Sequence, residues 1–150
     1  MKAVADATIL WKDTVTSNTD DAPAKTAALY APDAVFWGTV SEQVRDEPQH
    51  FSDYFEFFAR LPNLRLTEYS PAPTKVYGDF GIQTGIYTFA WEGADGKTVE
   101  KQCRFSFAFK KNHPAGTREW TLVHHHSSLM PEAPPGLKPV TDPPMEEVAQ

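Results

Sequence analysis

The sequence has a single cysteine, Cys103, and no apolar run that approaches the length of a membrane span. One cysteine excludes an intramolecular disulfide and a zinc site built on several thiolates. A transmembrane helix needs about 20 consecutive apolar residues, so we expect no membrane partner. Basic clusters are also missing, because at most two lysines or arginines are adjacent and the net charge is −6. A nucleic-acid partner is therefore not expected either.

The N-terminal stretch MKAVADATILWKD does not have the form of a secretory signal. Asp6 and Lys12 bracket an apolar stretch that is too short for the core of such a signal. We therefore expect the chain as given to carry no export signal. Its compartment stays open, since a domain cut from a plastid or periplasmic precursor fits equally well.

Hydrophobic residues make up 41% of the 150 residues and aromatic residues 13%. This composition excludes disorder of the whole chain and predicts one domain with an aromatic core. Six of the 13 prolines lie between residues 131 and 150. We therefore divide the chain into a folded domain over residues 1–130 and an extended, proline-rich tail or linker over residues 131–150.

Helical spacing of apolar residues dominates the first part of the chain. It predicts helices over residues 3–18, 21–30 and 46–61, with Asp21 and Asp46 as candidate caps. The last helix has an apolar stripe made of Phe51, Tyr54, Phe55 and Phe58. A short strand is expected between the second and third helices, over residues 34–39.

After residue 63 the pattern changes to alternation and turn signals. It predicts strands over residues 64–66, 75–92 with a Gly-Asp turn inside, 98–111 and 119–128. Helices followed by a run of antiparallel strands indicate an α+β fold. We expect a curved antiparallel sheet wrapped around the N-terminal helices as a cone, whose open end forms a pocket.

The stretch WTLVHHHSSLMP, residues 120–131, is the most unusual part of the sequence. Alternation along a strand separates its side chains into two sets. We assign the first set to the cone interior, because it begins with the more apolar residues: Trp120, Leu122, His124, His126 and Ser128. The other set contains Thr121, Val123, His125 and Ser127.

Three interpretations of the histidines and serines stay open. They can be packed, locally hydrogen-bonded residues, although burying so many polar groups without partners costs about 1–3 kcal/mol each. His124 and His126 can bind a metal ion if a third ligand comes from elsewhere in the fold. The third interpretation is a metal-free pocket, in which imidazoles relay protons and hydroxyls donate hydrogen bonds to an oxyanion.

Other polar residues are candidates for the same pocket. Thr39 ends the first strand, and Tyr54 lies on the otherwise apolar stripe of the long helix. Arg104 is the first residue of the alternating RFSFAF segment, on the face opposite the phenylalanines, and is either a surface charge or an anion-binding group.

The sequence resembles the nuclear transport factor 2-like superfamily, and within it the branch of the calmodulin-dependent kinase II association domain. The resemblance covers about residues 3–131 and is carried by LYAPDAVFWGT, the DYF of the long helix, GDFGIQTGIYTF, RFSFAFKK and WTLVHHHSSLMP. More narrowly, HHHSS followed by LMP resembles the iota-class carbonic anhydrases. The general pattern is weakly specific, because this fold supports many functions, whereas the HHHSS string is more specific.

This resemblance implies a cone-shaped homodimer that interconverts carbon dioxide and bicarbonate. Some members of the class work without metal and others are linked to manganese, so we expect no cofactor and leave zinc and manganese open. The family pocket uses a threonine, a tyrosine and a His/Ser pair. By motif these are Thr39, Tyr54, His126 and Ser128. His124 and Ser127 replace the pair if the strand faces are reversed, and Arg104 is a further substrate-binding candidate.

A metal-free mechanism must remove a proton from water as the O–C bond forms, with His126 as the expected acceptor. Zinc lowers the pKa of water from about 15.7 to about 7. General base catalysis typically contributes about 10²–10⁴-fold, so we expect a slower enzyme than the zinc classes.

Two other functions compete with this one. The first is a non-catalytic oligomerisation module. The second is an isomerase, cyclase or hydratase with a carboxylate base, for which Glu68, Asp79 and Glu100 are the candidates.

Overall fold

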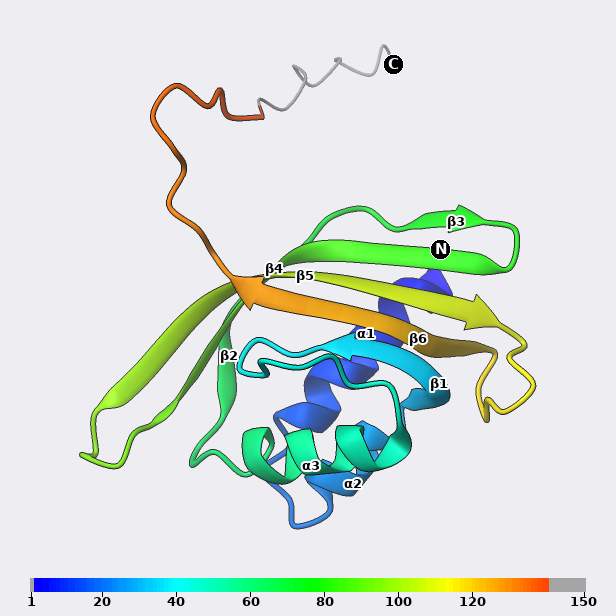
Figure 1. Cartoon of the computed structure of the whole chain (residues 1–150), viewed down its shortest axis with the longest axis horizontal. Helices are drawn as coiled ribbons and strands as arrows, with labels where there is room; N and C mark the ends of the chain where they lie inside the picture. Colours follow the sequence, from blue (N-terminus) through cyan, green and yellow to red (C-terminus); the bar gives the residue numbers. More distant parts are fainter. Residues whose placement is uncertain (1, 141–150) are drawn as a thin grey trace, which may run out of the picture.

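The structure is a computed structural model that describes residues 2–140, in which three helices lie against one face of a curved sheet (Figure 1). The helices are α1 (Lys2–Val15), α2 (Ala22–Ala27) and α3 (Pro48–Phe58). The strands are β1 (Tyr30–Trp37), β2 (Arg65–Pro71), β3 (Lys75–Tyr77), β4 (Phe80–Glu92), β5 (Thr98–Lys111) and β6 (Trp120–Leu129). This arrangement confirms the expected α+β fold with a curved sheet around N-terminal helices.

The strand order is β1-β6-β5-β4-β2, and β3 pairs with β4. Neighbouring strands are antiparallel except β1 and β6, which run parallel. In this parallel pair Phe36 is opposite His125 and Trp37 is opposite His126. The end of β1 and the turn that follows it therefore lie beside the HHHSS segment, although about 90 residues separate the two in the chain.

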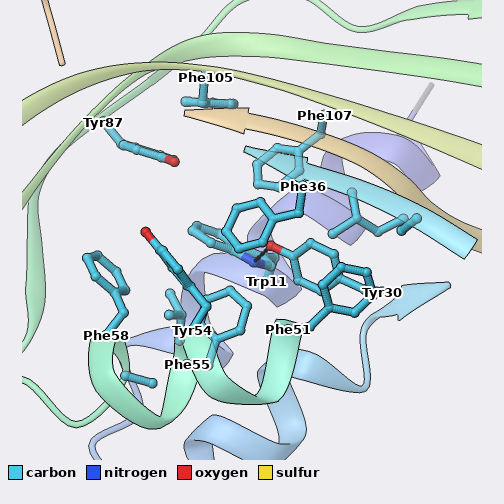
Figure 2. Packing of buried hydrophobic residues seen from close by; sticks show 14 of the residues in the cluster. Trp11, Tyr30, Phe36, Phe51, Tyr54, Phe55, Phe58, Tyr87, Phe105 and Phe107 are labelled. Carbon is cyan, nitrogen blue, oxygen red and sulfur yellow. Dashed lines mark hydrogen bonds between the residues drawn. The ribbon is translucent and has the colours of Figure 1, made fainter. Parts of the chain in front are cut away.

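The apolar stripe of α3 is confirmed. Its four aromatic residues are at most 6% exposed and pack on the concave side of the sheet, as Figure 2 shows for Phe51, Tyr54, Phe55 and Phe58. Burying each of them stabilises the fold by about 1.5–3 kcal/mol. The helix is capped at Glu47, one residue later than predicted, and no side chain makes the cap hydrogen bond.

Strand β6 contains a bulge that changes which residues face the interior. Leu122 pairs with Phe109 and His124 pairs with Ala108, so Val123 is an extra residue with no partner on β5. One extra residue inverts the alternation beyond it. Leu122 therefore faces the core before the bulge, and His125 and Ser127 face the core after it.

The prediction that His124, His126 and Ser128 share the interior face with Leu122 is consequently wrong. His126 is exposed, and His124 and Ser128 are half-buried on the opposite side of the sheet. The prediction assumed a regular strand, and the bulge breaks that regularity within the motif itself.

Residues 131–140 contain no helix or strand, and they are exposed. The predicted tail also includes residues 141–150, which lie outside the described part of the chain. Among residues 2–140, none of the helices has both the length and the apolar character needed to span a bilayer.

Candidate active site

His125 is a fully buried polar residue of the interior, with 1% of its surface exposed. Its ring is stacked between Phe36 of β1, at a centroid distance of 4.8 Å, and Phe107 of β5, at 4.1 Å. The edge of Trp11 from α1 approaches it at 5.0 Å. The imidazole is thus held by the strands on both sides of β6 and by the first helix.

Both ring nitrogens of His125 are hydrogen-bonded to tyrosines. Nδ1 lies 2.7 Å from the hydroxyl oxygen of Tyr30, and Nε2 lies 3.2 Å from that of Tyr87. Trp11 donates its indole N–H to the Tyr30 oxygen at 3.0 Å, the bond drawn in Figure 2. The rings of Trp11, Phe36 and Phe107, together with the two tyrosine hydroxyls, leave no side of the imidazole facing water.

The hydrogen-bonded chain continues from Tyr87 toward the open end of the cone. Tyr87 bonds to the hydroxyl of Ser127, whose Oγ lies 2.5 Å from Oγ1 of Thr39. Thr39 in turn donates to the sulfur of Cys103 at 3.8 Å. Five elements therefore contribute to one polar network: α1, β1 with its following turn, β4, β5 and β6.

The indole of Trp11 determines the direction of the hydrogen bonds, because it can only donate. Tyr30 already accepts this N–H, and its own hydroxyl hydrogen finds an acceptor within residues 2–140 only at Nδ1 of His125. Nε2 then carries the imidazole hydrogen and donates to Tyr87. In this order, Tyr87 donates to Ser127 and Ser127 to Thr39, so every hydroxyl hydrogen points away from the core toward the open end.

Burial alters the acidity of each titratable group in the network. Removal from water lowers the pKa of His125 well below its usual value, with further lowering from the neighbouring His124 and His126. The same desolvation raises the pKa of Tyr30 and of Tyr87 well above the usual tyrosine value. It also raises the pKa of the Cys103 thiol, although hydrogen bonds from Thr39 and Ser127 oppose this. All four groups are therefore neutral near pH 7.

Tyr54 reaches the same region from α3. Its hydroxyl accepts hydrogen bonds from the backbone N–H groups of Val40 and Thr39, and desolvation raises its pKa. In Figure 2 the hydroxyls of Tyr54 and Tyr87 both point into the space between α3 and the sheet. Gly38 makes this placement possible, because a Cβ at Gly38 would lie 2.3 Å from the Tyr54 ring.

A cavity of about 130 Å³ adjoins the outer end of the network. Its walls are mostly apolar, with Thr39 and Cys103 on the network side and Lys101 at the edge; the full lining is Thr39, Val40, Phe58, Phe89, Trp91, Lys101, Cys103 and Leu129. A water molecule occupies about 30 Å³ in the liquid. The cavity is therefore large enough for a small apolar molecule together with a water.

The structure brings together only some of the residues proposed from the sequence. Thr39, Tyr54 and Ser127 lie at the interior network or its mouth. The others lie on the outer face of the sheet, away from this cavity: Arg104, His124, His126 and Ser128. Arg104 donates its Nε–H to Ser128 there, at 3.0 Å.

No carboxylate lines the cavity. The candidate bases Asp79 and Glu100 bond to Lys110 and Thr67, whereas Glu68 accepts from Thr88 and Gln102. Within residues 2–140, no three histidine, cysteine or acidic residues gather in a way that suits a metal ion. His124 and His126 thus lack a third ligand in the described part of the chain.

Sequence reasoning missed His125, Tyr30, Tyr87 and Trp11. The apolar Val123 was a sign that the face opposite Leu122 is also buried in part, and it is the residue at the bulge. The sequence pattern predicts Tyr30 at the end of a helix, whereas in the structure it begins β1. Nothing in the spacing of Trp11 and Tyr87 distinguishes them from ordinary core residues.

A sequence profile described as the calcium/calmodulin dependent protein kinase II association domain matches residues 5–131. A putative association domain of this kind from Xanthomonas campestris is 30% identical, with 87% of this chain and 88% of that chain covered and a TM-score of 0.70. No curated protein matches the chain.

Two more distant structures share the fold. The S. rosetta CaMKII hub is 20% identical, covers 86% of this chain and 95% of its own, and has a TM-score of 0.67. A nuclear transport factor 2-like protein from Salmonella enterica is 17% identical, with coverages of 90% and 94% and a TM-score of 0.69.

Proposed function

Since the chain belongs to the calcium/calmodulin dependent protein kinase II association domain family, on a fold that serves several functions, we propose from its interior site that it is a carbonic anhydrase. The proposed reaction is the interconversion of carbon dioxide and bicarbonate, with the chemistry at Thr39 and Ser127. None of the related structures described above is named as a carbonic anhydrase, so the proposal rests on the site and on the HHHSS motif.

One observation carries the proposal. The Thr39–Ser127 hydroxyl pair stands between an apolar cavity and a buried, neutral imidazole. Carbon dioxide is apolar and suits the aromatic walls. Bicarbonate is a small anion that requires hydrogen-bond donors. The Thr39 hydroxyl supplies one when its hydrogen turns from the Cys103 sulfur toward the cavity. A site that binds both species needs these two surfaces next to each other.

In hydration, a water beside Thr39 and Ser127 attacks the carbon of carbon dioxide. As the O–C bond forms, the water passes a proton to the Ser127 oxygen, Ser127 passes its own to Tyr87, and Tyr87 passes its own to Nε2 of His125. Once bicarbonate has left, the proton returns from Nε2 through Tyr87 and Ser127 to a water in the cavity, which regenerates the site. Dehydration of bicarbonate runs the same steps in reverse. Thr39 and Ser127 are the catalytic residues in this scheme, and Tyr87 and His125 relay the proton.

The relay runs inward only when Nε2 of His125 is free to accept, which places the imidazole hydrogen on Nδ1. The Tyr30 hydroxyl hydrogen then has no acceptor, and an unpaired buried donor costs about 1–3 kcal/mol. The outward order, which donates to bicarbonate, is therefore the resting state. This cost, and the lowered pKa of His125, favour a slower enzyme than one with metal-bound hydroxide.

The test is stopped-flow carbon dioxide hydration by the whole chain and by Ser127→Ala and Ser128→Ala. These adjacent serines receive the same substitution but lie on opposite faces of β6. We expect Ser127→Ala to lower kcat/KM by about 10²-fold, and Ser128→Ala to stay near the wild-type rate. Absence of wild-type activity above buffer would rule out the function. Equal loss in both variants would rule out the interior site.

A second candidate is a non-catalytic oligomerisation module. It is favoured by the family match and by the related structures described as hubs, from S. rosetta and in the Chlamydomonas hub homology domain. Light scattering of the purified chain measures the assembly directly. A defined homo-oligomer with no hydration activity would favour this function over the enzyme, whereas a monomer would contradict it and the expected homodimer.

A further inference from the structure

The edge of the apolar cavity carries a positive charge, on Lys101 of β5. Within residues 2–140, Lys101 is the only charged residue that lines this cavity. It is two residues from Cys103, so both side chains lie on the same face of the strand, and both line the cavity. On β4 the residue opposite Lys101 is Phe89, which forms another part of the wall. Lys101 itself is exposed, so its ammonium lies where the cavity meets solvent.

No protein group neutralises this ammonium. Lys101 makes neither an ion pair nor a side-chain hydrogen bond within residues 2–140, whereas Lys110 on the same strand pairs with Asp79. The acidic neighbour of Lys101 in the chain, Glu100, points to the opposite face of β5 and accepts a hydrogen bond from Thr67. The charge at the cavity edge is therefore available to a ligand.

The charge of Lys101 acts on the inner part of the cavity. Burial raises the pKa of the Cys103 thiol overall, and the positive charge of Lys101 is one of the effects that oppose this rise. The same charge attracts any anion that lies between Thr39 and the cavity edge. The chain as a whole has a net charge of −6 and repels anions. Salt screens this repulsion beyond about 8 Å, so the nearby ammonium dominates at the edge.

We propose that Lys101 forms an outer bicarbonate subsite, which holds the anion as it leaves after hydration and as it enters before dehydration. Apolar walls cannot replace the hydration of an anion, so bicarbonate that moves between Thr39 and bulk water needs a charge on its path. The ammonium is a compact charge with three donors on a flexible stem, which suits a mobile anion. The subsite rests on the proposed function, because its ligand is the product of hydration. Lys101 takes no part in the proton transfer.

The experiment combines a binding titration with kinetics, both on the whole chain. Bicarbonate replaces chloride at constant pH and ionic strength, and NMR of the isotope-labelled chain follows the amides of Cys103 and Leu129. Stopped-flow hydration gives kcat/KM for carbon dioxide and the inhibition constant of bicarbonate.

The variants are Lys101→Gln, which removes the charge, and Lys101→Arg, which keeps it. Lys97→Gln is the matched control, because Lys97 is an exposed lysine just before β5 and does not line the cavity. Four residues of extended chain place it about 13 Å along the strand from Lys101. This distance exceeds the screening length in physiological salt.

We expect saturable shifts with bicarbonate in the wild-type chain. Lys101→Gln should weaken binding, and raise the inhibition constant, by about three- to tenfold, as fits one charge-assisted hydrogen bond at a partly exposed position. Lys101→Arg should weaken binding less, and Lys97→Gln not at all. In Lys101→Gln, kcat/KM for carbon dioxide should stay within about twofold of the wild type, because the transition state forms at Thr39 and Ser127.

Three results would overturn the subsite: shifts that do not saturate, unchanged affinity in Lys101→Gln, or equal weakening in Lys97→Gln. The titration does not depend on turnover, so it separates the subsite from the proposed function. An inactive chain that binds bicarbonate through Lys101 would exclude the carbonic anhydrase and support the subsite. An active chain whose affinity is unchanged in Lys101→Gln would do the reverse.

Discussion

The hydroxyl of Tyr30 lies 2.7 Å from Nδ1 of His125, and the two residues are 95 positions apart in the chain. Because Trp11 donates to the same hydroxyl, this contact determines the tautomer of a histidine that is sealed from water. The tautomer in turn sets whether the Thr39–Ser127 pair presents hydrogens or lone pairs to the cavity. A residue of the first helix thereby influences the chemistry at the open end of the cone.

This relationship predicts a single neutral tautomer of His125 with the hydrogen on Nε2. The ¹⁵N chemical shifts of the imidazole report the tautomer directly, and they should stay constant between about pH 5.5 and 8, because burial lowers the pKa of His125. Bicarbonate should leave the Nε2–H form dominant. A dominant Nδ1–H form would contradict the proposed direction of the hydrogen bonds.

The lowered pKa of His125 also predicts how stability depends on pH. In the unfolded chain this histidine takes up a proton below about pH 6.5, whereas in the folded chain it stays neutral. Folding free energy is therefore lost as the pH falls below the unfolded-state pKa, by up to about 1.4 kcal/mol per pH unit. The loss continues until the folded-state pKa is reached.

Urea unfolding between pH 5 and 7.5 measures this effect. His125→Phe should flatten the dependence, because Phe does not titrate. It should also lower stability at pH 7.5, since the hydroxyls of Tyr30 and Tyr87 lose a buried partner at about 1–3 kcal/mol each. His126→Phe on the outer face is the control and should keep the wild-type slope. The same slope in His125→Phe would show that another group is responsible.

Gly38→Ala should displace Tyr54 from the mouth of the network. The new Cβ would lie 2.3 Å from the Tyr54 ring, so the ring or the backbone must move. Overpacking of this kind costs about 1–3 kcal/mol. Adding Gly38→Ala to a Tyr54→Ala background should cost much less, because the clashing ring is gone. Thermal unfolding of the four proteins gives this double-mutant cycle, and equal costs in both backgrounds would exclude the clash as the cause.

Chelation tests the expectation that the reaction needs no metal. Extended dialysis against dipicolinate, followed by metal analysis, should leave the hydration rate unchanged, since the proposed proton path uses only hydroxyls and an imidazole. Loss of the rate, with recovery on adding back one particular metal, would contradict the proposed mechanism.

Much of the fold followed from local patterns. The Phe51–Phe58 stripe predicted α3 and its buried face, and the Gly-Asp and GADGK turns predicted the hairpins around β4. These features depend on neighbours within one or two turns of helix or across one hairpin. Such contacts are encoded by residues close together in the chain, which is why composition and spacing suffice for them.

The amino-acid sequence alone predicted the α+β cone. It also identified the HHHSS segment, Thr39 and Tyr54 as candidate residues of a polar pocket. The tertiary structure decided which of them meet. The bulge at Val123 turned His125 and Ser127 inward, and the parallel pairing of β1 with β6 brought Thr39 beside Ser127. Both depend on hydrogen bonds between strands that are distant in the chain, and a one-residue shift in such pairing exchanges the two faces of a strand.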